Sequence, residues 1–126
     1  MRKTINLKHP IMIDGKSVAQ IVVDTDEITA LHYAEADTRR RIAAGVKNIS
    51  IVPAVEFDFG LHPYIGFAAA VAANPGYTFA DLERVHGADM IEFCEVGRNF
   101  LLKSEESEQT NSGEQSENTA EPITQA

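Results

Sequence analysis

Two runs rich in Ile, Val and Leu occupy positions 4–24, and their alternation of apolar and polar residues, clear in the first run and less clear in the second, predicts a β-hairpin at the start of the chain. The dipeptide Asp14-Gly15 separates the two arms, and this pair favours a type I′ turn because both residues tolerate positive φ. Two registers stay open: a two-residue loop places Ile11 opposite Val18, and a three-residue loop places it opposite Ala19. Four apolar residues of the first arm share one parity and therefore one face: Ile5, Leu7, Ile11 and Ile13.

Helices are expected to cover this hairpin, because a hairpin alone is marginal in water. Acidic residues after the hairpin suit the start of a first helix, and Gly45 suits its left-handed end. Thr78 and Asp81 have the spacing of a capping box for a short third helix. Residues 46–60 show no clear pattern. The predicted fold class is α+β, with the hairpin packed against three to four helices at about 27–44, 64–73, 79–85 and 88–103.

The helix expected at 64–73 is apolar on all sides. Pro63 fits its first position, and Asn74-Pro75-Gly76 should end it. Such a helix is either central in the fold or packed against a partner. Small residues let another helix approach closely, so we expect a partner-binding surface made of Tyr64, Gly66, Phe67, Ala69 and Ala70.

Most of the negative charge lies at the C-terminal end of the chain. The 126 residues have a formal net charge of −8, and residues 104–126 contain six Glu and no Lys or Arg. The other 13 acidic and 11 basic residues leave residues 1–103 at −2. The segment 104–126 also has almost nothing apolar to bury, which is typical of disorder. We therefore expect a small α+β domain at 1–103 and a disordered acidic tail, rich in Ser, Glu and Gln, at 104–126.

The run Arg39-Arg40-Arg41 is a candidate contact for nucleic acid or another anion. However, Glu35 and Asp37 precede Arg39 and Arg41 by four residues, a spacing that favours salt bridges along a helix. A nearly neutral domain also lacks the clustered positive charge that phosphate binding requires. We therefore favour a salt-bridged helix end and do not expect a nucleic-acid partner.

The sequence shows no pattern typical of an enzyme. Its four His residues lack the spacing of a metal site, and Cys94 is the only thiol. We expect Cys94 to be buried and inert, and the acids Asp89, Glu92 and Glu95 to face solvent on the last helix. No cofactor or metal is expected. The single Cys fits a reducing compartment, and the longest apolar run is far shorter than the ~20 residues of a membrane helix, so we expect a soluble, cytoplasmic protein.

Three stretches follow one another in a characteristic order within residues 4–102. The first is the hairpin Ile-Asn-Leu-Lys-His-Pro-Ile-Met-Ile-Asp-Gly-Lys, and the second is Tyr-Thr-Phe-Ala-Asp-Leu-Glu-Arg-Val-His-Gly-Ala-Asp at 77–89. The third is a helix that ends in Asn-Phe-Leu-Leu at 99–102. In this order and at this length, the chain resembles the small tail assembly chaperones of contractile-tailed, Mu-like phages.

The resemblance implies a non-enzymatic helper in phage tail assembly. Members of that family bind the long, helical tape measure protein, keep it soluble until the tail tube assembles around it, and leave before maturation. Many are made in two forms, the longer by a programmed ribosomal frameshift. The implied partners are a helical segment of the tape measure protein and the tail tube assembly components. The implied location is the cytoplasm of the bacterial host, with the protein absent from the mature virion, and the family supplies no catalytic residues.

Two other functions stay open at this point. The protein is alternatively a small phage regulatory or nucleic-acid-associated protein, which would use the run at 39–41. A third alternative is that the protein is a structural component of the tail.

Overall fold

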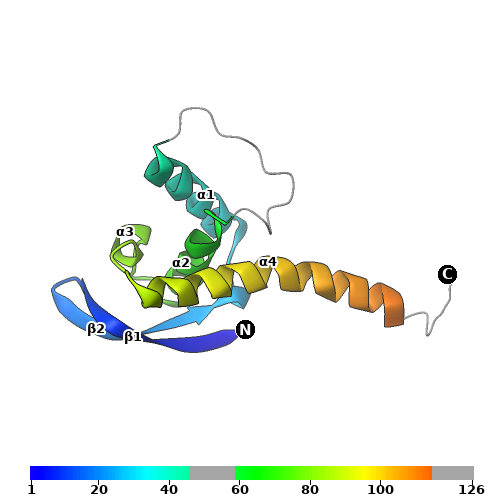
Figure 1. The fold of residues 1–126 in the computed structure, drawn as a ribbon, viewed down its shortest axis with the longest axis horizontal. Coiled ribbons are helices and arrows are strands. Elements are labelled where there is room, and N and C mark those ends of the chain that lie inside the picture. Colours follow the sequence, from blue (N-terminus) through cyan, green and yellow to red (C-terminus); the bar gives the residue numbers. More distant parts are fainter. Residues whose placement is uncertain (46–58, 115–126) are drawn as a thin grey trace.

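A computed structural model describes residues 1–45 and 59–114, with side chains as far as residue 102. The fold is α+β, as predicted: an antiparallel hairpin of β1 (Arg2–Ile13) and β2 (Lys16–Asp24) is followed by helices. These are the 3₁₀ turn η1 (Thr25–Glu27), α1 (Ala30–Ala44), α2 (His62–Ala73), α3 (Phe79–Leu82) and α4 (Ala88–Glu114). Helix α2 contacts β2, α1 and α4, and it occupies the middle of the domain (Figure 1).

The hairpin has the tighter of the two registers. Ile11 pairs with Val18 and Ile13 with Lys16, so the loop has two residues. Asp14 and Gly15 have φ values of 52° and 76°, the positive angles that a type I′ turn needs. The four aliphatic residues that share one parity in the first arm are all buried, as predicted, whereas Met12, on the opposite face, is 52% exposed. Ile21 and Val23 supply the buried face of the second arm.

A bulge interrupts β1 at the segment that contains Pro10. The register shifts between Asn6 and Ile11, so several residues of β1 have no partner in β2. The backbone N–H groups of Lys8 and His9 instead donate to the two carboxylate oxygens of Asp89, each at 2.8 Å. Asp89 is only 1% exposed, so the prediction that it faces solvent was wrong. Its carboxylate is buried because the unpaired amides of the bulge need acceptors.

The first helix begins three residues later than predicted. Asp24 caps the short turn η1 by accepting a hydrogen bond from the Asp26 N–H at 3.0 Å. The chain then turns, and Thr29 caps α1 in a reciprocal capping box with His32. Gly45 ends the helix in the left-handed conformation, as predicted.

Helices α2 and α4 cross at unusually short distance because glycine lies on both. A Cβ added at Gly66 would overlap the carbonyl oxygen of Phe93, and one added at Gly97 would overlap the carbonyl oxygen of His62. Asn74 ends α2 as predicted and ties it to the hairpin, since its side-chain amide donates to the Val22 carbonyl at 2.8 Å. The core formed around this crossing joins the hairpin residues to Ile65, Phe67, Ala68, Ala69, Ala70, Leu82, Phe93 and Val96.

The last two helices differ from their predicted lengths. Helix α3 starts with the predicted Thr78–Asp81 capping box but ends at Leu82, before the expected Val85. Helix α4 continues to Glu114, so its predicted end at Lys103 was wrong. Extending an existing helix needs no new nucleus, which makes continuation easier than the composition suggested. The rest of the expected tail, 115–126, lies outside the described residues, as does the unpatterned segment 46–58.

Candidate functional site, an apolar groove between α1 and α3

A groove of about 570 Å³ runs between α1 and α3. It is open to solvent, and α1 lies on the side of α2 away from the hairpin (Figure 1). Residues of both helices line it: Leu31, Ala34, Glu35, Thr38, Arg39, Ile42, Thr78, Phe79 and Ala80.

One wall of the groove is an uncovered apolar row on α1. Leu31 is 68% exposed and Ile42 is 65% exposed. They are three turns apart and lie within roughly 20° of one another around the helix. Ala34 and Thr38 lie between them and are also exposed. We call these four residues the α1 row. Only Ala36 of this helix is fully buried, so α1 presents its large aliphatic side chains to solvent instead of to the core.

The floor of the groove comes from α3, which is short but firmly held. Leu82 is fully buried, and Phe79 is 7% exposed at the bottom of the groove. Arg84 follows the helix and donates to the Met12 carbonyl near the hairpin tip at 2.8 Å. The small side chain of Ala80 leaves the groove open. A second helix laid here would therefore meet an apolar floor as well as the α1 row.

A hydrogen-bonded chain fixes the charged rim of the groove. Arg39 Nη2 donates to Glu83 Oε1 at 2.6 Å, and the Tyr64 hydroxyl donates to Glu83 Oε2 at 2.8 Å. This chain links α1 to α2 through the residue that follows α3. Partial burial, together with the hydrogen bond to the Glu83 carboxylate, raises the pKa of Tyr64 to about 12. The neighbouring Glu35 is exposed and has no ion-pair partner within the described residues.

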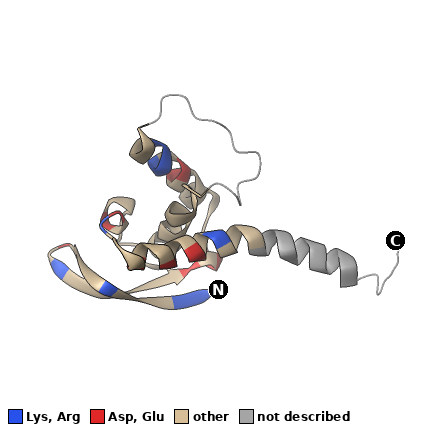
Figure 2. Cartoon of the chain, viewed as in Figure 1, with Lys and Arg blue, Asp and Glu red and all other residues tan. Residues whose placement is uncertain are grey.

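The arginine run is a salt-bridged helix end. Asp37 accepts from Arg40 at 3.0 Å and from Arg41 at 3.1 Å, and Figure 2 shows this basic run beside acidic residues of the same helix. The predicted pair of Asp37 with Arg41 is therefore confirmed. The predicted pair of Glu35 with Arg39 was wrong, because Arg39 reaches across to Glu83.

Most of the predicted partner-binding surface is not a surface in this structure. Gly66, Phe67, Ala69 and Ala70 are buried in the core of the chain itself, and the backbone that approaches closely at Gly66 is that of α4 and not of another protein. Tyr64 alone is partly exposed, and it supports the groove rim through Glu83. An apolar helix of this kind is either central in the fold or packed against a partner, and in this structure α2 is central. The exposed groove residues escaped the sequence reasoning because α1 shows only a weak apolar periodicity.

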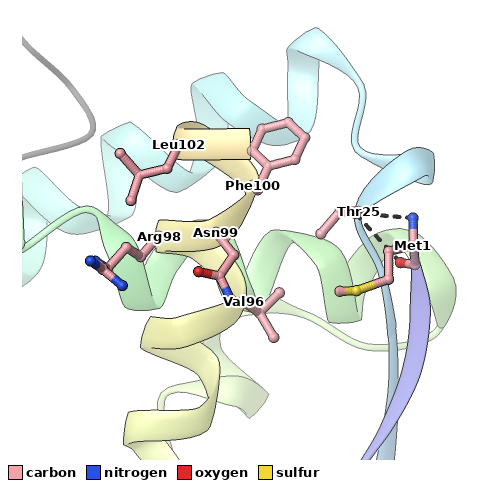
Figure 3. A pocket seen from close by; sticks show the side chains of 7 residues that line it. All are labelled: Met1, Thr25, Val96, Arg98, Asn99, Phe100 and Leu102. Atoms are coloured by element: carbon pink, nitrogen blue, oxygen red, sulfur yellow. Dashed lines mark hydrogen bonds between the residues drawn. The ribbon is translucent and has the colours of Figure 1, made fainter. Parts of the chain in front are cut away.

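A second cavity, of about 340 Å³, lies where the start of β1 meets α4 (Figure 3). The hydroxyl of Thr25 donates to the Met1 carbonyl at 3.4 Å at its edge. Among the described residues that line it, Arg98 has the only charged side chain, so these residues form no acid–base pair. The lining residues are Met1, Thr25, Val96, Arg98, Asn99, Phe100 and Leu102.

The side chains of the domain with the most potential for chemistry, Cys94, His9, His86 and Asp89, are held by packing and hydrogen bonds. Cys94 is half-buried, and burial raises the pKa of its thiol. The rings of His9 and His86 stack at 4.9 Å beside Asp89. Burial opposes the ionisation of Asp89, but the two backbone donors and these imidazoles lower its pKa below the ordinary value. In the described part of the chain, no three His, Cys, Asp or Glu side chains gather closely enough to hold a metal ion.

Comparisons of the chain with protein-family models, with curated proteins and with solved structures found no match. Within residues 1–45 and 59–114, no helix has the length and apolar character needed to cross a membrane.

Proposed function

We propose that this protein is a non-enzymatic tail assembly chaperone that binds an amphipathic helix of a phage tape measure protein in the groove between α1 and α3. The observation that carries the proposal is the uncovered α1 row above an apolar floor. An amphipathic helix that lays its apolar face in such a groove is a recurring mode of peptide recognition.

The energetics of the groove fit a reversible holder. Covering a fully exposed Leu or Ile side chain contributes about 1.5–3 kcal/mol. Leu31 and Ile42 are about two-thirds exposed, so together they contribute roughly 2–4 kcal/mol when covered. A micromolar complex requires about 8 kcal/mol, so the client helix must also gain from the floor and the rim. The resulting complex is weak enough for the client to be released when the tail tube assembles.

In this proposal the protein acts in the cytoplasm of the bacterial host. It shields the apolar helices of the tape measure protein until tail tube components replace it, and it does not enter the mature virion. The paired arginines at 39–41 support this function over a nucleic-acid contact, because each already has an acidic partner: Glu83 for Arg39 and Asp37 for the other two.

Co-expression with the tape measure protein of the same phage or prophage tests the proposal. Leu31→Glu should reduce co-purification at least tenfold, since it places a charge in the apolar wall. The matched control is Ile91→Glu, which makes the same kind of change at an exposed aliphatic residue (53% exposed) on α4. The control should bind like the wild type.

Two outcomes would overturn the proposal. The first is equal binding by both variants, which would exclude the groove. The second is the loss of tape measure binding in moderate salt, or on replacement of all three arginines by Ala, with Leu31→Glu unaffected. The contact would then be electrostatic and the site would be the arginine run.

A further inference from the structure

We infer that, in the free protein, a second copy of the chain covers the α1 row by packing its own α1 antiparallel against it. The dimer does not depend on the proposed function. If the proposed function holds, the second copy also blocks the groove, and a client helix must displace it; this further role rests on the proposed function.

The α1 row is self-complementary in its apolar positions. In an antiparallel pair the numbers of facing residues add to a constant, so Leu31 faces Ile42 of the second copy when that constant is 73. Both residues are about two-thirds exposed in the single chain. The two-fold axis then repeats the contact, and each Leu31 covers one Ile42. The small side chains of Ala34 and Thr38 lie between these contacts and permit close approach.

The charges beside the row are complementary in the same register. Glu35 and Arg39 lie roughly 40° and 80° around the helix from Leu31, on the same flank of the row. A two-fold axis across the helix pair keeps that flank on the same side in both copies. Glu35 then faces Thr38 of the second copy and lies one residue from its Arg39. The Glu35 carboxylate, which has no ion-pair partner in the described part of its own chain, thus lies beside the Arg39 guanidinium of the second copy, which also bonds to its own Glu83. The two-fold axis forms this contact twice.

A parallel pair would lose both features. Leu31 would face Leu31 and Glu35 would face Glu35, which sets like charges against each other. The charge order of α1, acidic before basic, therefore selects the antiparallel arrangement. The interface is small, so we expect a dimer that dissociates on dilution.

Sedimentation equilibrium of the full chain between about 5 μM and 1 mM tests the dimer in the range expected for a small interface. The wild type should show a monomer–dimer equilibrium. Leu31→Glu should weaken it by at least about 100-fold, because the substitution acts in both copies. Ile91→Glu should leave it unchanged. A wild type that stays monomeric throughout, or a dimer insensitive to Leu31→Glu, would overturn the inference.

Disulfide trapping tests the orientation, in a Cys94→Ser background. An equimolar mixture of the Leu31→Cys and Ile42→Cys variants should form a covalent dimer under mild oxidation. Neither variant should do so alone, because like positions are offset by 11 residues, about 16 Å along the helix, in the antiparallel pair. Trapping within each single variant, with no mixed species that joins position 31 of one copy to position 42 of the other, would show a parallel pair and refute the proposed register.

The trapped dimer also separates the inference from the proposed function. It should fail to co-purify with the tape measure protein, and reduction of the disulfide should restore binding. If the trapped dimer binds tape measure protein as well as the reduced protein does, the second copy does not block the client site. The chaperone function would then remain intact. If neither form binds, the chaperone function fails while the dimer stands.

Discussion

Gly66→Ala is the substitution that most directly tests the packing of α2 against α4. In an open helix, this change stabilises by about 1 kcal/mol, because Gly is the poorer helix former. Here the new Cβ would overlap the carbonyl oxygen of Phe93, and it would also come within 3.0 Å of the Phe93 Cα. The atoms in the way belong to a backbone and not to the end of a flexible side chain, so α4 itself must move.

The overlap should outweigh the helix propensity. Overpacking a close-packed core costs typically about 1–3 kcal/mol, and the upper end applies when a helix must shift. Subtracting the propensity gain of about 1 kcal/mol leaves a net loss of about 2 kcal/mol. For a domain of this size, 1 kcal/mol corresponds to about 4–8 °C in Tm, so we expect Tm to fall by roughly 10 °C or somewhat more.

Thermal unfolding followed by circular dichroism is a sufficient assay. Gly76→Ala is the matched control, because a Cβ there meets nothing within 4 Å and its φ lies outside the left-handed region. The control should be neutral or slightly stabilising. If Gly66→Ala leaves Tm unchanged or raises it, the close crossing of α2 and α4 is wrong.

Three further predictions concern other parts of the domain. Asp89→Asn should lower Tm at neutral pH; since the pKa of Asp89 is depressed in the folded protein, the wild-type advantage should be complete above pH ~4 and shrink as pH falls below it. A wild-type advantage that is constant from pH 7 to pH 3 would contradict the two hydrogen bonds to the bulge. Gly15→Ala should cost about 1 kcal/mol, seen as a Tm loss of about 4–8 °C, because its φ of 76° disfavours any side chain; an unchanged Tm would argue against the two-residue turn. Cys94 should react with a small thiol reagent at neutral pH at least tenfold more slowly than in the denatured chain, because burial disfavours the thiolate; equal rates would show an exposed thiol.

Local signals in the sequence predicted much of the fold. Asp14-Gly15 marked the turn, Gly45 and Asn74 marked two helix ends, and Thr78 with Asp81 marked a helix start. Each of these depends on a backbone angle or a hydrogen bond between residues close in sequence, so a short window contains the necessary information. The start of α1 and the end of α3 were each misplaced by three residues. The largest error is the end of α4, where composition favoured a stop but helix elongation carried the backbone on to Glu114.

Contacts between distant residues were beyond such reasoning. Asp89 is buried because a bulge some eighty residues earlier leaves two amides without partners. Nothing near Asp89 in the sequence distinguishes it from Glu92 or Glu95. Arg39 has an acid at the helical spacing but pairs with Glu83, which only the docking of α3 brings within reach. In both cases the partner is chosen by tertiary packing.

The partner-binding surface that the sequence predicted on α2 lies mostly inside the core. Ala and Gly on α2 admit a neighbouring backbone, and composition alone does not say whether that backbone belongs to the same chain. The structure supplies the neighbour: Phe93 and Gly97 on α4 meet α2 where its side chains are smallest. With that surface occupied, the exposed aliphatic side chains that border a groove are those of α1, which is the less apolar of the two helices. Leu31 and Ile42 add little to the core, yet they lie on one side of the helix and border the groove. The proposed binding surface therefore rests on large aliphatic side chains that the fold leaves outside its own core, and not on an apolar helix that the core needs.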